Sequence, residues 1–249
     1  RTGVGITALG DMLAAANIRY GSQESIDTTE KIYKELKFGC YEQSIKMAEE
    51  NGPFPIWNYE LEKDNQFLLR IKDERPDLYE RMKKSGRRNI ACLTTAPTGS
   101  ISQLAKLVNR FGTSSGIEPV YEYAMIRRKK GNPGDDNFRT DFIDDVGDHW
   151  QEFTVYHSGV EEWRDVNPDK DVKDSPYHKS CAADLDWKFR VELQSVAQKH
   201  IDHAISSTVN LPNNVSKEVV AEIYTNAWKM GLKGITVYRD GCRSGVILK

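Results

Sequence analysis

The stretch from Asn89 to Ser102 reads NIACLTTAPTGSIS, and it shows most directly how this chain folds. Its first part, Asn89 to Ala96, is a compact apolar and β-branched run, which is typical of a buried strand. Pro97-Thr98-Gly99 then marks a turn. In the segment from Ser100 to Asn109, one helical face carries Ile101, Leu104, Leu107 and Val108, and Ser100 or Ser102 is available as an N-cap. The stretch therefore predicts a strand, a turn and a helix in succession.

The same order of strand and helix recurs on both sides of this stretch. Val4 to Leu9 is a short apolar strand that leads into a helical segment starting at Asp11. Further strands are expected at 204–211 and 234–238, and further helices at 185–203 and 217–230. We also expect two amphipathic helices within 25–50, broken near Gly39, and polar helices within 57–88. This alternation predicts an α/β protein with parallel strands.

One long segment departs from this pattern. From about residue 129 to residue 183 the chain is rich in Gly, Asn, Pro and Asp, with only scattered aromatic residues. We interpret it as a loop-rich, exposed excursion with short helices that belongs to the same domain, so that residues 1–249 form one unit.

Composition excludes several classes of function. The 249 residues carry 35 basic and 37 acidic side chains, a formal charge of -2, which offers no general attraction to phosphate backbones or anionic lipid. No apolar run approaches the length of about 20 residues that a membrane span needs. We therefore expect a cytoplasmic protein with no nucleic-acid partner and no membrane association.

The cysteines and the first residues of the chain add two expectations. Cys40, Cys92, Cys181 and Cys242 are widely spaced and form no C-x-x-C pair, which argues against a disulfide framework and against a dithiol redox motif. The chain begins at Arg1 and is apolar and glycine-rich within a few residues, so we expect it to be part of a longer protein.

The turn at Pro97 to Ser102 is the strongest indication of a binding site. A strand that ends in a Gly-containing turn at a helix N-terminus leaves backbone N–H groups unpaired, and such a place binds anions, usually phosphate. The turn lacks the lysine of a P-loop, so hydrolysis of nucleoside triphosphates is not indicated. On the residues alone, an ordinary helix cap is as good an interpretation as a phosphate site.

Two other sequence patterns indicate a function less strongly. Gly3 to Ala8 matches the G-x-G-x-x-A dinucleotide pattern, with Asp27 about twenty residues on, but the strand that should precede the glycines is missing. We favour glycines that allow close packing of a core strand. A zinc site is conceivable at His178, Cys181, His200 and His203, although their spacing is loose and histidines near a helix end are commonly unliganded.

Taken together, the order of the motifs resembles the C-terminal half of the catalytic barrel of ribonucleotide reductases, especially the class II, adenosylcobalamin-dependent enzymes. The resemblance covers nearly the whole chain and rests on RTGVGITALGD (1–11), APTGSIS (96–102), SGIEP (115–119), AISSTVNLP (204–212) and GLKGITVYRDG (231–241).

The resemblance implies a fold and a site. The fold would be the second half of a ten-stranded α/β barrel, a five-stranded parallel half-barrel with surrounding helices. The turn would hold the phosphates of a ribonucleotide substrate, and the substrate-binding residues would be Thr98, Gly99, Ser100, Ile101 and Ser102.

The resemblance also implies a radical chemistry that these residues do not complete. In the family a thiyl radical on a cysteine abstracts the ribose 3'-hydrogen, and a cysteine pair supplies electrons when the 2'-hydroxyl is lost. The finger-loop pattern Asn-x-Cys-x-Glu, which carries the radical cysteine, does not occur in this chain, and none of the four cysteines matches a family role. Ser207 stands where many relatives carry lysine. We therefore assign no catalytic residue and no metal ligand to this chain.

The expected function is that of a reductase component that contributes the phosphate-binding half of the active site. Its expected partners are the N-terminal half of the reductase, as a separate chain or a missing segment, a ribonucleotide, and an external dithiol reductant. Adenosylcobalamin would be held by the complete enzyme, and we expect an oligomer. Two alternatives stay open: a stand-alone nucleotide-binding module without catalysis, and a zinc-stabilised structural protein.

Overall fold

Extended segments that pair in parallel, each with the next such segment along the chain, form the centre of the molecule. The structure, a computed structural model, describes residues 1–134 and 138–242. Val4 bridges Leu93 and Thr95 bridges Ile205, both in parallel. β4 (Thr208–Leu211) then pairs in parallel with β5 (Thr236–Arg239). The mixed α/β character is as the sequence predicted, and these central segments are parallel as expected.

The five-stranded half-barrel that we expected is not formed by the described residues. β4 and β5 make a two-stranded sheet, whereas the expected strands at 4–9 and 90–96 contribute only isolated bridges. Val4 is 42% exposed, and Ala8 adopts a left-handed conformation with φ 64°. The first segment therefore turns away from its neighbour after a few residues, and the sheets of the described chain do not close into a barrel.

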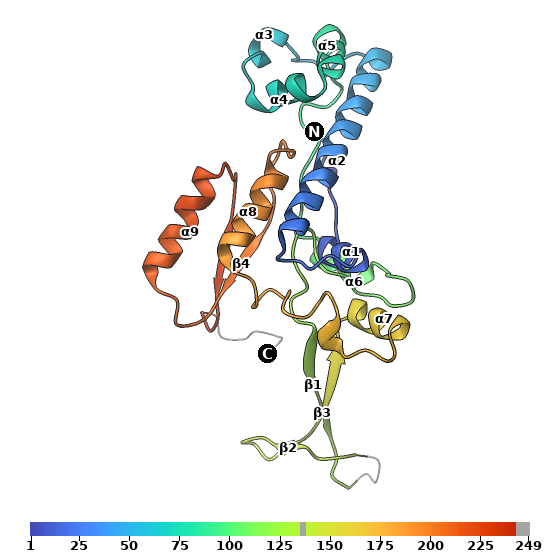
Figure 1. Cartoon of the computed structure of the whole chain (residues 1–249), viewed down its shortest axis with the longest axis vertical. Helices are drawn as coiled ribbons and strands as arrows, with labels where there is room; N and C mark the ends of the chain where they lie inside the picture. The colour runs from blue at the N-terminus through green and yellow to red at the C-terminus, as the bar shows by residue number, and fades with distance from the viewer. Residues whose placement is uncertain (135–137, 243–249) are drawn as a thin grey trace.

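Helices cover this centre (Figure 1). Their bounds are α1 Leu9–Ala15, α2 Gln23–Asn51, α3 Tyr59–Glu62, α4 Gln66–Glu74, α5 Pro76–Ser85, α6 Gly99–Leu104, α7 Ser158–Val166, α8 Trp187–Gln198 and α9 Lys217–Lys229, with a 3-10 helix, η1, at Val172–Asp174. None of these helices is long and apolar enough to cross a membrane.

The prediction of two helices broken near Gly39 is wrong, because α2 is one continuous helix of 29 residues. Gly39 is exposed, and a Cβ placed there would meet no atom within 4 Å. A glycine in a helix costs only about 1 kcal/mol relative to alanine. The buried side chains on both sides of it, Tyr33, Phe38 and Tyr41, hold the helix to the main core and outweigh that cost.

The excursion contains a sheet that the sequence did not reveal. β1 (Ala124–Gly131) pairs antiparallel with β3 (His149–Tyr156), which also pairs with β2 (Phe142–Ile143). These strands form an arm that projects away from the helices (Figure 1). β1 carries the run Arg127 to Lys130, which is exposed and lacks the alternation of a half-buried strand. We had expected short helices here, of which α7 is one.

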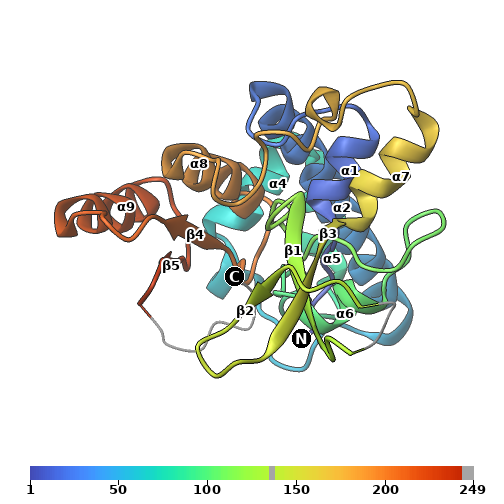
Figure 2. The ribbon, with the colours of Figure 1, turned by 90° about the horizontal axis from the view of Figure 1, so that it is seen from below.

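The C-terminal elements form a smaller core of their own. Val191 of α8, Val209 and Leu211 of β4, and Ile223 of α9 are buried together. Figure 2 shows α8 and α9 on one side of the molecule and α1, α2 and α7 on the other. The helix expected at 100–109 ends early, at Leu104, which is 78% exposed. With so little of its apolar face buried, packing does not extend the helix.

Candidate anion-binding site

The turn at Pro97 to Ser102 opens helix α6 in an unusual way. Thr98 is the N-cap residue, it adopts the left-handed conformation with φ 53° and ψ 23°, and its side chain does not cap the helix. The backbone N–H groups of Gly99, Ser100 and Ile101 donate to no other group in the described part of the chain. Three donors therefore stand together at the positive end of the helix.

Helix α1 begins in the same way, but the protein itself binds two of its first three N–H groups. Its N-cap residue, Ala8, is also left-handed and also lacks a side-chain cap. There, however, Leu9 N donates to Gly116 O at 3.2 Å and Asp11 N donates to Ser114 Oγ at 3.2 Å. The open donors of α6 are therefore a feature of that turn and not of the left-handed cap as such.

The side chain of Thr98 anchors the turn to the interior. Its Oγ1 accepts a hydrogen bond from Gly116 N at 2.7 Å and lies 2.9 Å from Thr7 Oγ1. Gly116 is buried, and a Cβ there would lie 2.7 Å from Ala96 O, so the segment can pass this close only as glycine. This anchoring holds Thr98 in a conformation that a β-branched residue rarely adopts.

The five predicted site residues do not all face outward. Gly99, Ser100 and Ile101 are exposed, and Ile101 is 60% exposed. Ser102 is 1% exposed, and its hydroxyl donates to Gly99 O at 2.9 Å and lies 3.0 Å from Ser115 Oγ. Thr98 and Ser102 therefore shape the turn, while the other three present their backbone to solvent.

A buried polar network lies behind the turn, and sequence reasoning missed it. Asp11 of α1 is 2% exposed. Its Oδ1 lies 2.8 Å from His157 Nε2 and accepts a hydrogen bond from Tyr177 OH at 2.8 Å, while Oδ2 accepts one from Ser114 N at 2.6 Å. Burial acts to raise the pKa of Asp11, but the hydrogen bonds from these partners outweigh it and lower the pKa.

A second buried network surrounds Ser207. Arg190 Nη2 pairs with Glu118 and also donates to Ser207 Oγ at 3.0 Å and to Thr208 O at 3.0 Å. Glu118 Oε1 accepts from Thr208 N at 2.8 Å. Arg190 is 5% exposed, so its charge depends on these partners. The network fixes the start of β4 against the SGIEP segment.

The other patterns of the sequence have structural explanations. A Cβ on Gly5 would lie 2.0 Å from Thr94 O, so this glycine does allow two segments to pack closely, although they form an isolated bridge and Gly5 is exposed, not part of the core strand that we expected. For zinc, the described residues contain no group of three or more His, Cys, Asp or Glu side chains that could hold a metal ion. His200 is 2% exposed, and neither of its ring nitrogens has a hydrogen-bond partner in the described chain.

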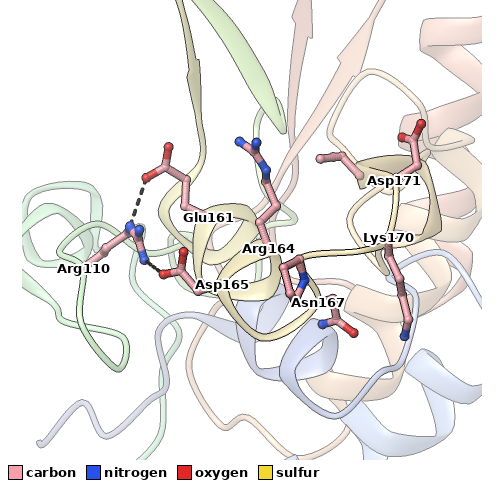
Figure 3. A pocket seen from close by; sticks show the side chains of 9 residues that line it. Arg110, Glu161, Arg164, Asp165, Asn167, Lys170 and Asp171 are labelled. Carbon is pink, nitrogen blue, oxygen red and sulfur yellow. Dashed lines mark hydrogen bonds and ion pairs between the residues drawn. The ribbon is translucent and has the colours of Figure 1, made fainter.

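The larger cavity described lies away from the turn. It has a volume of about 560 Å³ and lies beside α7, with Arg110, Arg164 and Lys170 among its cationic side chains (Figure 3). Arg110 pairs with Glu161 at 2.9 Å and with Asp165, as the dashed lines show. Since its charges of opposite sign are present in similar number, the cavity has no clear preference for an anion or a cation.

Comparison with known proteins extends over almost the whole chain. Residues 1–238 match the family model described as "Ribonucleotide reductase, barrel domain". The chain is 30% identical, over all of its length, to a vitamin B12-dependent ribonucleoside-diphosphate reductase of Mycobacterium tuberculosis, of which it covers 32%. It is 28% identical to an enzyme of the same name from Thermoplasma acidophilum, covering 29% of it, and 28% identical to the ribonucleoside-diphosphate reductase subunit alpha of Helicobacter pylori, covering 28% of it. The chain thus spans about a third of the length of these relatives.

Proposed function

Because the chain belongs to the ribonucleotide reductase barrel-domain family, we propose that it supplies the part of a reductase active site that holds the phosphates of a ribonucleotide, at the turn from Pro97 to Ser102. The observation that carries this proposal is the contrast between α6 and α1. Both helices start from a left-handed residue, but only α6 keeps its first three N–H groups free in the described chain.

The chemistry of the turn suits a phosphate. Backbone N–H groups at a helix N-terminus can each donate to an anionic oxygen, and the helix dipole adds a favourable field. Ser100 is exposed and adds a hydroxyl donor. A Cβ placed on Gly99 would meet no atom within 4 Å, so the space beside the N–H groups is open to a ligand.

Three of the four cysteines support the assignment of radical chemistry to residues outside this chain, while the fourth, Cys242, is exposed. Burial raises the pKa of Cys92 to about 11 and that of Cys181 to about 12. Burial also raises the pKa of Cys40. A buried thiol of raised pKa is a poor nucleophile and is shielded from a dithiol reductant. We propose that the radical cysteine and the reducing pair come from the remainder of the reductase.

The cofactor is also proposed to reside in the complete enzyme. The names of the M. tuberculosis and T. acidophilum relatives include vitamin B12. A corrin is considerably larger than the drug-sized ligands that fill pockets of about 300–1,000 Å³. The cavity beside α7, at about 560 Å³ and with mixed charges, does not fit such a group.

A pair of glycine variants tests the phosphate site. Gly99→Val puts a side chain beside the open N–H groups, whereas Gly39→Val does the same on an exposed face of α2. Neither glycine has a positive φ or a neighbour within 4 Å of its Cβ position, so the protein itself can accommodate both changes. The measurement is the affinity for a ribonucleotide of an assembly reconstituted with the remainder of a reductase, together with the melting temperature.

We expect Gly99→Val to lose at least about tenfold in affinity, equivalent to about 1.4 kcal/mol, and Gly39→Val to bind like the wild type. Ser100→Ala removes one hydrogen bond to a charged group and should lose less than Gly99→Val. If Gly99→Val folds and binds the nucleotide with unchanged affinity, the phosphates are held elsewhere.

A further inference from the structure

We propose that Asp11 is a positioning residue that holds the segment 113–116 in place and, through that segment, the open turn of α6. The inference rests on the phosphate site proposed above, and it adds the means by which that site is kept in shape. It also links the turn to the excursion, because two of the groups that hold Asp11 come from there.

Two reciprocal hydrogen bonds join Asp11 and Ser114, and we refer to this pair of bonds as the clasp. Ser114 N donates to Asp11 Oδ2 at 2.6 Å, and Asp11 N donates to Ser114 Oγ at 3.2 Å. The residues are 2% and 5% exposed. In a buried environment such a pair is strong when it is complete and costly when one partner is missing. The clasp therefore fixes Ser114 relative to the first turn of α1.

The segment held by the clasp carries the contacts that shape the turn. Thr113 N donates to Ser102 O at 2.9 Å, and Ser115 Oγ lies 3.0 Å from Ser102 Oγ. Gly116 N donates to Thr98 Oγ1 at 2.7 Å. Thus the residues on both sides of Ser114 bind the N-cap and the fourth residue of α6. The free N–H groups lie between Thr98 and Ser102, so a shift of the segment 113–116 would move the residues on both sides of them.

The other oxygen of Asp11 is held by the excursion. His157, the residue just before α7, and Tyr177 both contact Oδ1. A Cβ on Gly159 would lie 2.1 Å from Tyr177 OH and 2.5 Å from Asp11 Oδ1, so the backbone of α7 approaches the carboxylate as only glycine can. Burial and the charge of Asp11 raise the pKa of Tyr177, which keeps its hydroxyl protonated as a donor.

These contacts make the geometry of the turn depend on a buried carboxylate, that of Asp11, which is 2% exposed. Asp11 joins these two sets of contacts, since its Oδ2 faces the segment 113–116 and its Oδ1 faces the excursion. Weakening the clasp should therefore loosen the anion site while leaving its own donors intact. A merely structural Asp11 would instead affect the stability of the chain and not the affinity of the turn.

Two serine variants of the full chain separate these roles. Ser114 and Ser44 are both buried, and each hydroxyl accepts one backbone hydrogen bond, from Asp11 N at 3.2 Å and from Asn89 N at 3.0 Å. Ser114→Ala breaks half of the clasp. Ser44→Ala removes the bond from Asn89 N and also the bond that Ser44 Oγ donates to Asn89 Oδ1 at 3.0 Å, so it is a control far from the turn that should cost at least as much stability. Asp11→Asn is the more severe variant. The probe is inorganic pyrophosphate, titrated while the amide resonances of ¹⁵N-labelled Gly99 and Ile101 are followed, with urea unfolding measured in parallel.

We expect pyrophosphate to move both resonances in the wild type and in Ser44→Ala with the same dissociation constant. In Ser114→Ala this constant should rise about three- to tenfold, and in Asp11→Asn at least about tenfold. Equal constants in Ser114→Ala and Ser44→Ala, with both variants folded, would overturn the positioning role and leave the phosphate site standing. Resonances that do not move in the wild type would overturn the site and the inference together. If Asp11→Asn does not fold, the serine pair decides.

Discussion

Thr98 Oγ1 lies 2.9 Å from Thr7 Oγ1, so the extended segments that lead into α1 and α6 touch at the starts of these helices. Thr7 comes just before the left-handed Ala8 of α1, and Thr98 is itself the left-handed N-cap of α6. Gly116 N approaches both hydroxyls, at 3.3 Å and 2.7 Å. Through these contacts the segment at Gly116 holds the starts of both α1 and α6.

Removing the hydroxyl of Thr98 should destabilise the chain. Thr98→Val keeps the shape of the side chain but takes away the acceptor of Gly116 N, leaving only the longer contact to Thr7. We expect the free energy of unfolding to fall by about 1 to 2 kcal/mol, measured by urea denaturation. Thr225→Val, on the exposed face of α9, should stay within about 0.5 kcal/mol of the wild type. An equal effect of the two variants would contradict the anchoring role.

Gly39→Ala should stabilise the chain by about 0.5 to 1 kcal/mol, because alanine loses less conformational entropy in a helix interior and a Cβ at this position meets no atom within 4 Å. Urea denaturation and circular dichroism measure the effect. A loss of stability would mean that α2 is broken at Gly39 after all.

Stability should fall in mild acid because of His200. Burial, together with the nearby charge of Lys37, lowers its pKa from 6.5 to about 4. Between pH 6.5 and pH 4 His200 is protonated in the unfolded chain but neutral in the native chain. Stability is therefore lost as the pH falls through this interval, and His200 has no effect on stability above it. From pH 7 to pH 5 the loss due to His200 should be about 2 kcal/mol.

His200→Leu tests this assignment, since leucine does not titrate and neither ring nitrogen of His200 has a hydrogen-bond partner in the described chain, Nε2 lying 3.9 Å from Glu30 Oε1. Urea denaturation at pH 7 and pH 5 should show a clearly smaller difference for the variant. The same pH dependence in variant and wild type would assign the effect to other groups.

The exposed apolar residues near the turn should make the chain associate. Ile101, Leu104, Val108 and Phe111 are 60%, 78%, 77% and 65% exposed, which soluble monomers avoid when such residues gather. We expect light scattering to show self-association, or association with the remainder of a reductase when this is supplied. The double variant Leu104→Ser and Val108→Ser should associate less. A stable, dilute wild-type monomer that binds no hydrophobic dye would count against this expectation.

Local patterns predicted the kinds of element better than their extent. The run from Asn89 to Ser102 gave the correct order of extended segment, turn and helix, and the family resemblance is confirmed. The end of α6 and the continuity of α2 were missed because both depend on which apolar residues find a packing partner, as at Leu104 and around Gly39. The strands of the arm were missed because β1 is exposed and so carries no buried stripe.

The buried network could not be predicted from one sequence. Asp11 contacts residues 103, 146 and 166 positions away, and nothing in the spacing of Ser114, His157 and Tyr177 indicates that they meet. Ser102 likewise looked like an N-cap or a ligand contact, and only its burial shows that its hydroxyl bonds within the protein. Such roles follow from tertiary contacts and not from local pattern.

The most direct test of the central claim is the formation of deoxyribonucleotides in the presence of adenosylcobalamin and a dithiol. The chain alone should give none, and activity should appear when a polypeptide with the finger-loop cysteine is added. Replacing the wild-type chain by Gly99→Val in the same mixture should then lower activity at limiting ribonucleotide, while Gly39→Val should not. Turnover by the isolated chain, or full activity with Gly99→Val at limiting ribonucleotide, would contradict the account.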